Sequence, residues 1–209
     1  LNAALQVIRT KGYTATTIDD ICAGAGVTKG SFFHHFGGKV ELALATVEHW
    51  NTMTGDLFAT APYQQIADPR ERLLAYIDFR SQLVQGGLPD FTCLLGTMVQ
   101  ETFETSPPIR EACHSGMAQH AQTVAVMAAA AKVRYAPDAD WDPEALAWYT
   151  QAVIQGAFIL AKAQGSPRMA LGCIDQLRNH VAAVLSTPNS AQKTTATSPE
   201  PTHKPTSKA

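Results

Sequence analysis

The sequence predicts an all-α protein of about nine helices, with a small N-terminal module of three short helices and a larger helical body. Two observations support this fold class. Apolar residues recur at intervals of three and four along most of the chain, which is the spacing of one face of an α-helix. No segment shows the alternation of apolar and polar residues that is typical of a half-buried strand.

The composition is that of a globular protein with a packed core. The chain has 209 residues, a hydrophobic fraction of 45% and a formal net charge of −2, so any contact with nucleic acid must depend on local geometry and charge. Its four cysteines include no CxxC pair, which argues against a zinc ribbon or a disulfide framework. Without an apolar run of membrane-spanning length or a secretory leader, the sequence predicts a cytoplasmic protein with no membrane partner.

The first two helices are short. An apolar stripe at Leu1, Leu5 and Ile8 defines the first helix, and Gly12 is well suited to end it. The pattern already includes Leu1, so the sequence does not show where this helix begins. A second helix is predicted after Thr17, because a threonine followed by aspartates is typical of an N-cap and first turn.

A tight turn around Gly26 separates the second helix from a third, and glycine adopts such turns most easily. Thr28 can cap the third helix, and the pair Gly37 and Gly38 ends it. Residues 17–36 therefore have the pattern helix, turn, helix. The third helix would be about 13 Å long at ~1.5 Å per residue, which matches a B-DNA major groove roughly 12 Å wide.

The third helix has a polar first half and an aromatic second half, within the string GVTKGSFFHHFGGK at residues 26–39. The polar half, TKGS, has slim side chains, and its lysine and hydroxyls are able to contact bases or phosphates. We expect Phe32 and Phe36 to anchor the helix and so direct the polar half outward. Their predicted partners are Ile18, Ile21 and Val40.

Glycines and prolines divide the body into six longer predicted helices. They lie approximately at residues 39–50, 73–84, 93–103, 109–131, 144–163 and 167–185. The last two begin at Asp-Pro and Ser-Pro pairs, which are typical of N-cap and N1 positions. The remaining residues, 187–209, are rich in Ser, Thr and Pro and cannot bury enough apolar area, so we expect a disordered tail.

The string TTIDDICAGAGVTKGSFFHHFGGKVELA, at residues 16–43, strongly resembles the DNA-binding domain of the TetR (tetracycline repressor) family of bacterial transcription regulators. The resemblance implies a helix-turn-helix DNA-binding domain at residues 1–45 and a helical ligand-binding and dimerisation domain at residues 46–186. It further implies a homodimer that binds a palindromic double-stranded operator, usually as a repressor, and that a small-molecule effector releases. No cofactor is implied.

By position, the resemblance assigns DNA contacts to one group of residues around the third helix. They are Thr17, Thr28, Lys29, Gly30, Ser31, Phe33, His34, His35 and Lys39. One departure is notable, because the family commonly has a tyrosine at the position of Phe33, and the tyrosine hydroxyl bonds a phosphate. Phe33 lacks that hydroxyl, so this contact is lost or replaced by His34 or His35.

The body contains sulfur-containing, aromatic and histidine residues that build either an ordinary core or an adaptable apolar pocket. The resemblance favours a pocket. Its predicted lining residues are Cys93, Met98, Phe103, Met117, His120, Met127, Trp148 and Phe158.

The last two helices, at about 144–163 and 167–185, have apolar residues on wide faces, which suggests burial on two sides. Two such helices from each protomer would form an isologous four-helix dimer interface, with Gly156 and Ala157 permitting close approach. The alternative is a single thick core within one protomer.

Cys93 supports a second version of the regulator. The segment FTCLLG resembles the GCLLG segment of one family branch, in which some members use the thiol to sense electrophiles or oxidants. A helix N-terminus stabilises a thiolate, which favours reactivity, although a free cysteine more often simply packs.

A metal site and an enzyme are the remaining alternatives. His34 and His35 are adjacent on a helix and point about 100° apart, so they are poorly placed to share an ion, and we expect no metal. An enzyme with a structural N-terminal module is a remote alternative, because no phosphate loop, metal cluster or catalytic triad is legible in the sequence.

Overall fold

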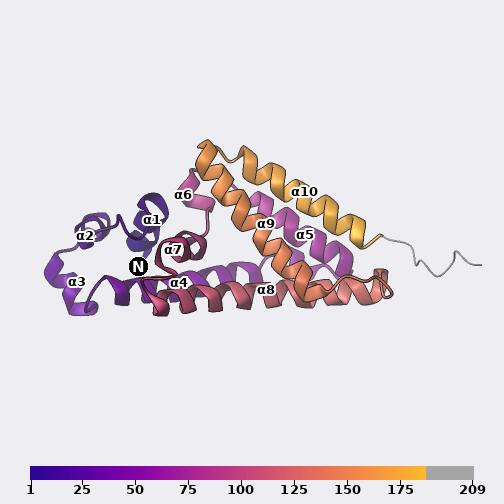
Figure 1. The fold of residues 1–209 in the computed structure, drawn as a ribbon, viewed down its shortest axis with the longest axis horizontal. Helices are drawn as coiled ribbons and strands as arrows, with labels where there is room; N and C mark the ends of the chain where they lie inside the picture. The colour runs from indigo at the N-terminus through magenta and orange to yellow at the C-terminus, as the bar shows by residue number, and fades with distance from the viewer. Residues whose placement is uncertain (187–209) are drawn as a thin grey trace, which may run out of the picture.

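The computed structural model describes residues 1–186, where helices are the only regular secondary structure (Figure 1). The prediction of an all-α fold is therefore confirmed. The elements are α1 (Asn2–Lys11), α2 (Ile18–Ala25), α3 (Lys29–His35), α4 (Lys39–Ala59), the 3-10 helix η1 (Pro62–Gln65), α5 (Pro69–Gln82), α6 (Leu88–Phe91), α7 (Leu94–Thr102), α8 (Pro107–Tyr135), α9 (Pro143–Gln164) and α10 (Arg168–Val184). The predicted disordered tail, residues 187–209, lies outside the described residues.

Two short elements account for the difference from the predicted nine helices. The four residues of α6 follow a pair of glycines, and their apolar pattern is too short to recognise as a helix. The linker predicted between Pro62 and Pro69 contains η1, and Pro69 occupies the first turn of α5.

The helices α1, α2 and α3 form the N-terminal module at one end of an elongated molecule (Figure 1). Its apolar cluster consists of Ala4, Ile21, Cys22, Phe32 and Leu42, with Ile18 and Phe36 at the edge. The anchoring position predicted for Phe32 is confirmed. The prediction for Val40 is wrong, because Val40 is exposed, and Leu42, about 200° further round α4, occupies the cluster instead.

Local hydrogen bonds fix the ends of α2 and α3. The Thr17 hydroxyl accepts a hydrogen bond from the Asp20 amide, and the Asp20 carboxylate accepts one from the Thr17 amide, which makes a reciprocal capping box. Gly26 then adopts a left-handed conformation with φ of 67°, which reverses the chain between the two helices. The sequence signals for helix, turn and helix are thus local ones.

In the body, the long helices α4 and α8 run side by side, and α5, α9 and α10 complete a helical stack with α8 (Figure 1). Aspartate caps followed by proline begin two of these helices. The Asp68 carboxylate accepts from the Arg70 and Glu71 amides at the start of α5, and the Asp142 carboxylate accepts from the Ala145 amide at the start of α9.

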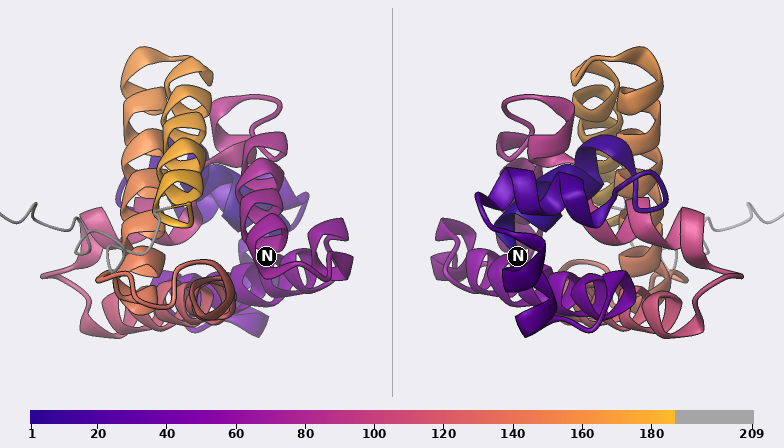
Figure 2. Two further views of the ribbon diagram at one scale, coloured as in Figure 1. Left: turned by 90° about the vertical axis from the view of Figure 1, so that its right-hand side faces the viewer. Right: turned by 90° about the vertical axis from the view of Figure 1, so that its left-hand side faces the viewer.

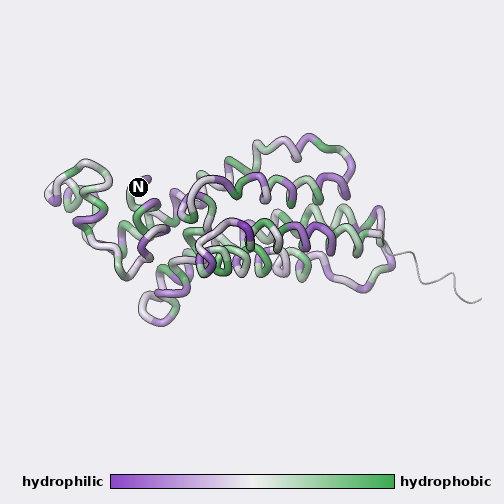
Figure 3. The backbone as a smooth tube through the Cα atoms, turned by 90° about the horizontal axis from the view of Figure 1, so that it is seen from above, coloured by the Kyte–Doolittle hydropathy of each residue, from purple (hydrophilic) through white to green (hydrophobic). Residues whose placement is uncertain are grey.

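The helices α9 and α10 stand side by side at one flank of the molecule (Figure 2). Hydrophobic and hydrophilic residues are interspersed along the helices, as in amphipathic helices (Figure 3). In α10, Ile174, Leu177 and Val181 are buried within the protomer. Ala157, expected at a dimer interface, is also fully buried in the protomer core. No helix in residues 1–186 has the length and apolar character needed to span a membrane.

A junction between α1 and α7 positions the N-terminal module on the body. The Glu101 carboxylate at the end of α7 accepts hydrogen bonds from the Tyr13 amide (3.2 Å) and the Thr14 amide (2.7 Å), just after α1. Gly12 has φ of 86°, a conformation that favours glycine, and a Cβ atom there would crowd the Glu101 carboxylate.

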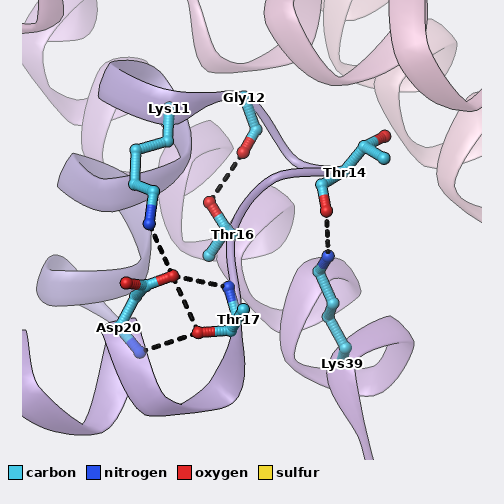
Figure 4. Close-up of polar contacts among 7 residues, drawn as sticks. All are labelled: Lys11, Gly12, Thr14, Thr16, Thr17, Asp20 and Lys39. Atoms are coloured by element: carbon cyan, nitrogen blue, oxygen red, sulfur yellow. Dashed lines mark hydrogen bonds and ion pairs between the residues drawn. The ribbon is translucent and has the colours of Figure 1, made fainter.

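The carbonyl of Thr14 is held from the other side by Lys39, whose Nζ donates to it at 3.1 Å (Figure 4). Glu101 therefore bonds the amide of Thr14, and Lys39 bonds its carbonyl. We call this arrangement the Thr14 clamp. It connects α7, the loop after α1 and the first residue of α4.

Candidate DNA interface and ligand cavity

The solvent-facing side of α3 carries most of the predicted DNA contacts. Lys29, Gly30, His34 and His35 are exposed, and Ser31 is half-buried. Phe33 is 55% exposed, which is unusual because phenylalanine side chains are normally buried. Its ring contacts Phe32 edge-on, with 5.1 Å between centroids. The buried Phe32 thus holds the helix while its neighbours face outward.

Lys29 forms an ion pair with Asp19 of α2, with 2.9 Å between Nζ and Oδ1. The hydrogen bond to Asp19 raises the pKa of Lys29. Both side chains are largely exposed, so the pair contributes little to stability and a phosphate is able to displace the carboxylate. Lys29 is therefore charged and available at the surface of α3.

Three further predicted contacts make hydrogen bonds within the protein, and Figure 4 shows those of Thr17 and Lys39. The Thr17 hydroxyl donates to Asp20 Oδ2 at 2.7 Å, and the Thr28 hydroxyl caps α3 by accepting from the Ser31 amide at 3.2 Å. Lys39 belongs to the Thr14 clamp, its ammonium lies 4.4 Å from the centre of the Tyr13 ring, and burial lowers its pKa. The phosphate contacts assigned to these residues stay predictions.

A cavity of about 200 Å³ opens within the body. Its walls come from α4, α5, α8 and α9, and it extends to α1 and the segment that links α6 to α7. The aromatic lining residues are Trp50, Phe58, Phe91, His120 and Phe158. Such a mainly apolar space with a few polar groups is typical of a small-molecule site.

Four of the eight predicted pocket residues line this cavity, namely Cys93, Met117, His120 and Phe158. The other four do not. Met98 and Met127 are buried in the packed core, whereas Phe103 is 53% exposed and Trp148 stacks parallel to His114 on the outside. Helical periodicity shows which residues are apolar, but it does not show whether an apolar face meets a neighbouring helix or an open space.

His120 is the polar centre of the cavity wall. Its Nε2 lies 2.8 Å from the Tyr76 hydroxyl and 3.2 Å from Arg80 Nη1. Because the guanidinium only donates, Nε2 accepts and the ring proton lies on Nδ1. Burial, with a smaller effect of Arg80, lowers the pKa of His120 to about 3, so the ring is neutral at pH 7.

Two arginines line the cavity that the sequence did not indicate. Arg9 of α1 is only 7% exposed, and its Nε donates to the Thr92 carbonyl at 2.7 Å. Arg80 of α5 lies over the Phe58 ring, with 5.2 Å from its guanidinium carbon to the ring centre. Arginine is rarely buried, so neither side chain is expected in a cavity from sequence alone. The only available signal was that Arg9 directly follows the apolar Ile8.

Cys93 is the N-cap of α7 and is half-buried. It lines the cavity described above and also a second one of about 220 Å³, which Lys162 and Glu101 line as well. The nearby Cys113 is fully buried, and burial raises the pKa of its thiol to about 12. Thiol sensing by Cys93 stays a prediction. Among residues 1–186, no group of three His, Cys, Asp or Glu side chains is placed to hold a metal ion.

Comparison with known proteins accounts for both parts of the chain. Residues 1–46 match the model described as "Bacterial regulatory proteins, tetR family", and residues 69–187 match "Tetracyclin repressor-like, C-terminal domain". The chain belongs to the TetR family. The resemblance found in the sequence is thus confirmed, and because TetR-family members are transcription regulators and not enzymes, the enzyme alternative is removed.

Curated relatives within the TetR family are transcription regulators. The transcriptional regulator AcuR of Cereibacter sphaeroides is 28% identical over 171 residues, which cover 80% of this chain and 76% of AcuR. The regulator LmrA of Bacillus subtilis is 32% identical over 120 residues, which cover 54% of this chain and 61% of LmrA.

Solved structures of TetR-family proteins share the fold. The regulatory protein TetR from Rhodobacter sphaeroides is 27% identical and superimposes with a TM-score of 0.76, covering 86% of this chain and 95% of that protein. The reduced form of NemR from E. coli has the same TM-score at 20% identity, over 90% of this chain and 95% of NemR, and supports the fold alone.

The state of His120 predicts how acid affects the stability of this TetR-family protein. Below pH 6.5 the unfolded chain takes up a proton on this histidine, but the folded protein does not until about pH 3. Stability is therefore lost as the pH falls through this window, by at most about 1.4 kcal/mol per pH unit. We expect His120→Gln to reduce this loss when the free energy of unfolding in urea is measured at a series of pH values.

The exposed His114 on the same helix provides the control, because His114→Gln also removes an imidazole but lies outside the cavity. Its curve of unfolding free energy against pH should run parallel to that of the wild type. If the curve for His120→Gln did the same, His120 would not be the buried neutral group described above.

Proposed function

We propose that this TetR-family protein is a dimeric repressor that inserts α3 into the major groove of a palindromic operator and is released by a small molecule bound in the body. The observation that carries the proposal is the reach of the ligand cavity, which has Arg9 of α1 among its walls. A ligand there would touch the same helix that packs against α2 of the N-terminal module. Ligand binding and DNA binding would therefore act on one structural element.

The surface of α3 supports the DNA-binding part of the proposal. Lys29, His34 and His35 supply cationic or hydrogen-bonding groups, and the bare backbone at Gly30 allows close approach. The two α3 helices of a dimer would enter successive major grooves about 34 Å apart. We expect operator binding to weaken as the salt concentration rises, because cationic side chains such as Lys29 release counterions from the phosphates that they contact.

The outer flank of α9 and α10 supports the dimer. Tyr149, Ala152, Gly156 and Leu160 recur at helical spacing along α9, and each is exposed or half-buried. Leu160 is 46% exposed, and Met169 and Leu171 are exposed apolar residues of the neighbouring helix α10. Such an unpartnered apolar flank is suited to an isologous contact with a second copy.

Release would follow from a shift between two conformations. A ligand that fills the cavity better in one arrangement of α1 and α7 favours that arrangement, in proportion to its differential affinity. An arrangement that moves α1 also moves α2 and α3, which changes the separation of the two α3 helices in the dimer. Selection from a pool of random duplexes, at low and high salt, tests the function as a whole. Failure to retain any sequence selectively would overturn it.

Phe33 provides a sharper test of how α3 meets DNA. If its ring faces a phosphate, Phe33→Tyr adds a hydroxyl that donates to it, and operator affinity should rise by about 2- to 10-fold for one added hydrogen bond. Gel-shift titration of the selected operator measures this. Phe103→Tyr is the matched control, because Phe103 is equally exposed but lies at the end of α7. Unchanged or weaker binding by Phe33→Tyr would mean that Phe33 does not face the DNA backbone.

Gly156 tests the dimer interface. Within the protomer, a Cβ atom at Gly156 would meet nothing within 4 Å, so Gly156→Arg should leave the fold intact. In the proposed dimer the arginine would separate the two α9 helices, and sedimentation equilibrium should show at least about tenfold weaker dimerisation, a penalty near 1.4 kcal/mol. Gly55→Arg on α4, where a Cβ is equally free, is the control and should not change the dimer. A dimer unaffected by Gly156→Arg would contradict this interface.

A further inference from the structure

The cavity that extends from the body to α1 carries an excess of positive charge. Arg9 and Arg80 both line it, and within residues 1–186 neither guanidinium has a carboxylate within the 4.0 Å of an ion pair. Asp90 is the single acidic side chain among the lining residues of the described chain. Buried or half-buried cations are normally paired, so two unpaired arginines around one space call for an explanation.

Arg9 is the more deeply buried of the two. Its Nε is occupied by the Thr92 carbonyl, and its guanidinium lies 4.9 Å from the centre of the Trp50 ring. Burial lowers the pKa of Arg9, which reflects the cost of removing a cation from water. Within the described residues, its two terminal nitrogens donate no hydrogen bond. A guanidinium has five N–H donors in one plane and is suited to bind a planar acid group.

Arg80 reaches the cavity from α5, in the body. Its Nη1 donates a hydrogen bond to His120 Nε2. Because His120 is neutral, this contact orients the guanidinium but leaves its charge uncompensated. The contact with the Phe58 ring adds orientation in the same way.

Asp90 offsets only part of this positive charge, because its carboxylate attracts the Arg9 guanidinium but forms no ion pair with it. Its Oδ2 accepts from the Gly87 amide at 2.8 Å as a cap of α6, and its Oδ1 accepts from Gln6 Nε2 at 3.2 Å. It is also exposed at the edge of the cavity. One partly solvated carboxylate against two guanidiniums leaves the cavity net positive.

We propose that the effector of this regulator is a small organic anion, whose acid group pairs with Arg9 and Arg80 and whose apolar part lies against the aromatic wall. This inference rests on the proposed function and specifies the ligand class of the same cavity. The acid group would form charge-assisted hydrogen bonds, which a neutral ligand cannot match. A volume of about 200 Å³ suits a single ring or a short chain, since a cavity of roughly 150 Å³ holds benzene.

The position of Arg9 gives the charge a regulatory consequence. Its Nε bond to Thr92 connects α1 to the residue directly before the N-cap of α7. An anion that binds the Arg9 guanidinium would reorient it and so strain or break its hydrogen bond to the Thr92 carbonyl. The ligand thereby contacts the N-terminal module directly through Arg9.

Paired carboxylates and amides test the charge requirement in the full chain. We would measure dissociation constants by calorimetry for benzoate against benzamide, for hexanoate against hexanamide, and for benzylamine as a cation. Each carboxylate should bind about 10- to 100-fold more tightly than its amide, as expected for a hydrogen bond to a charged group. Benzylamine should bind more weakly than either benzoate or benzamide.

Arg80→Gln and Arg9→Gln should each reduce the preference for carboxylate over amide while leaving amide binding nearly unchanged. Arg110→Gln, which removes an exposed arginine of α8 outside the cavity, should leave the preference intact. Circular dichroism checks folding, and if Arg9→Gln does not fold, Arg80→Gln decides. The proposal is overturned if neither carboxylate is preferred in the wild type, or if the preference survives in the folded arginine variants.

Operator binding separates this inference from the proposed function. If the ligand-free protein binds no operator, the regulatory function fails, whatever the calorimetry shows. If it binds operator but the carboxylates have no advantage, only the ligand class is wrong. Carboxylate binding that also weakens the operator complex supports both.

Discussion

The placement of the N-terminal module on the body depends on how the segment after α1 is held. In the Thr14 clamp, Glu101 of α7 accepts the amides of Tyr13 and Thr14, and Lys39 donates to the Thr14 carbonyl. Backbone groups held by charged side chains form stronger hydrogen bonds than neutral pairs do. The clamp therefore determines where α1 ends relative to both α7 and α4, and α2 and α3 follow from there.

The same junction explains how the cavity and the DNA-binding surface can influence each other. Arg9 and the clamp lie at the two ends of the contact between α1 and the α6–α7 segment, one through Thr92 and the other through Glu101. Gly12 favours this contact, because its φ of 86° suits glycine and a side chain there would displace the Glu101 carboxylate. In the proposed function, a two-state movement of α1 against α7 would link the cavity to α3.

The sequence predicted what depends on local chemistry. Capping by Thr17 and Thr28, the turn at Gly26 and the anchoring by Phe32 are all determined by residues a few positions apart, and the structure contains each of them. The lining of the cavity was only half predicted, because Phe103 and Trp148 look like pocket residues but lie on the surface. Whether an apolar side chain faces a cavity depends on helices distant in the sequence.

The contacts that hold α1 against α7 were beyond sequence reasoning for the same reason. Arg9 and Thr92 are separated by 83 positions, and Glu101 and Thr14 by 87. No local pattern links such residues, and an arginine or a glutamate on a helix is ordinarily assigned to solvent. The hydrogen bond of Lys39 to the Thr14 carbonyl was equally hidden from the sequence, and its predicted DNA contact stays a prediction.

The most direct test of this account is the operator affinity of Glu101→Gln, measured beside Glu104→Gln. Both changes remove one negative charge near the end of α7, and charge alone would tighten DNA binding in both. The clamp predicts the opposite for Glu101→Gln, a weakening of about tenfold as the module loses its fixed position, with Glu104→Gln equal to or tighter than the wild type. Equal or tighter operator binding by Glu101→Gln would contradict the account.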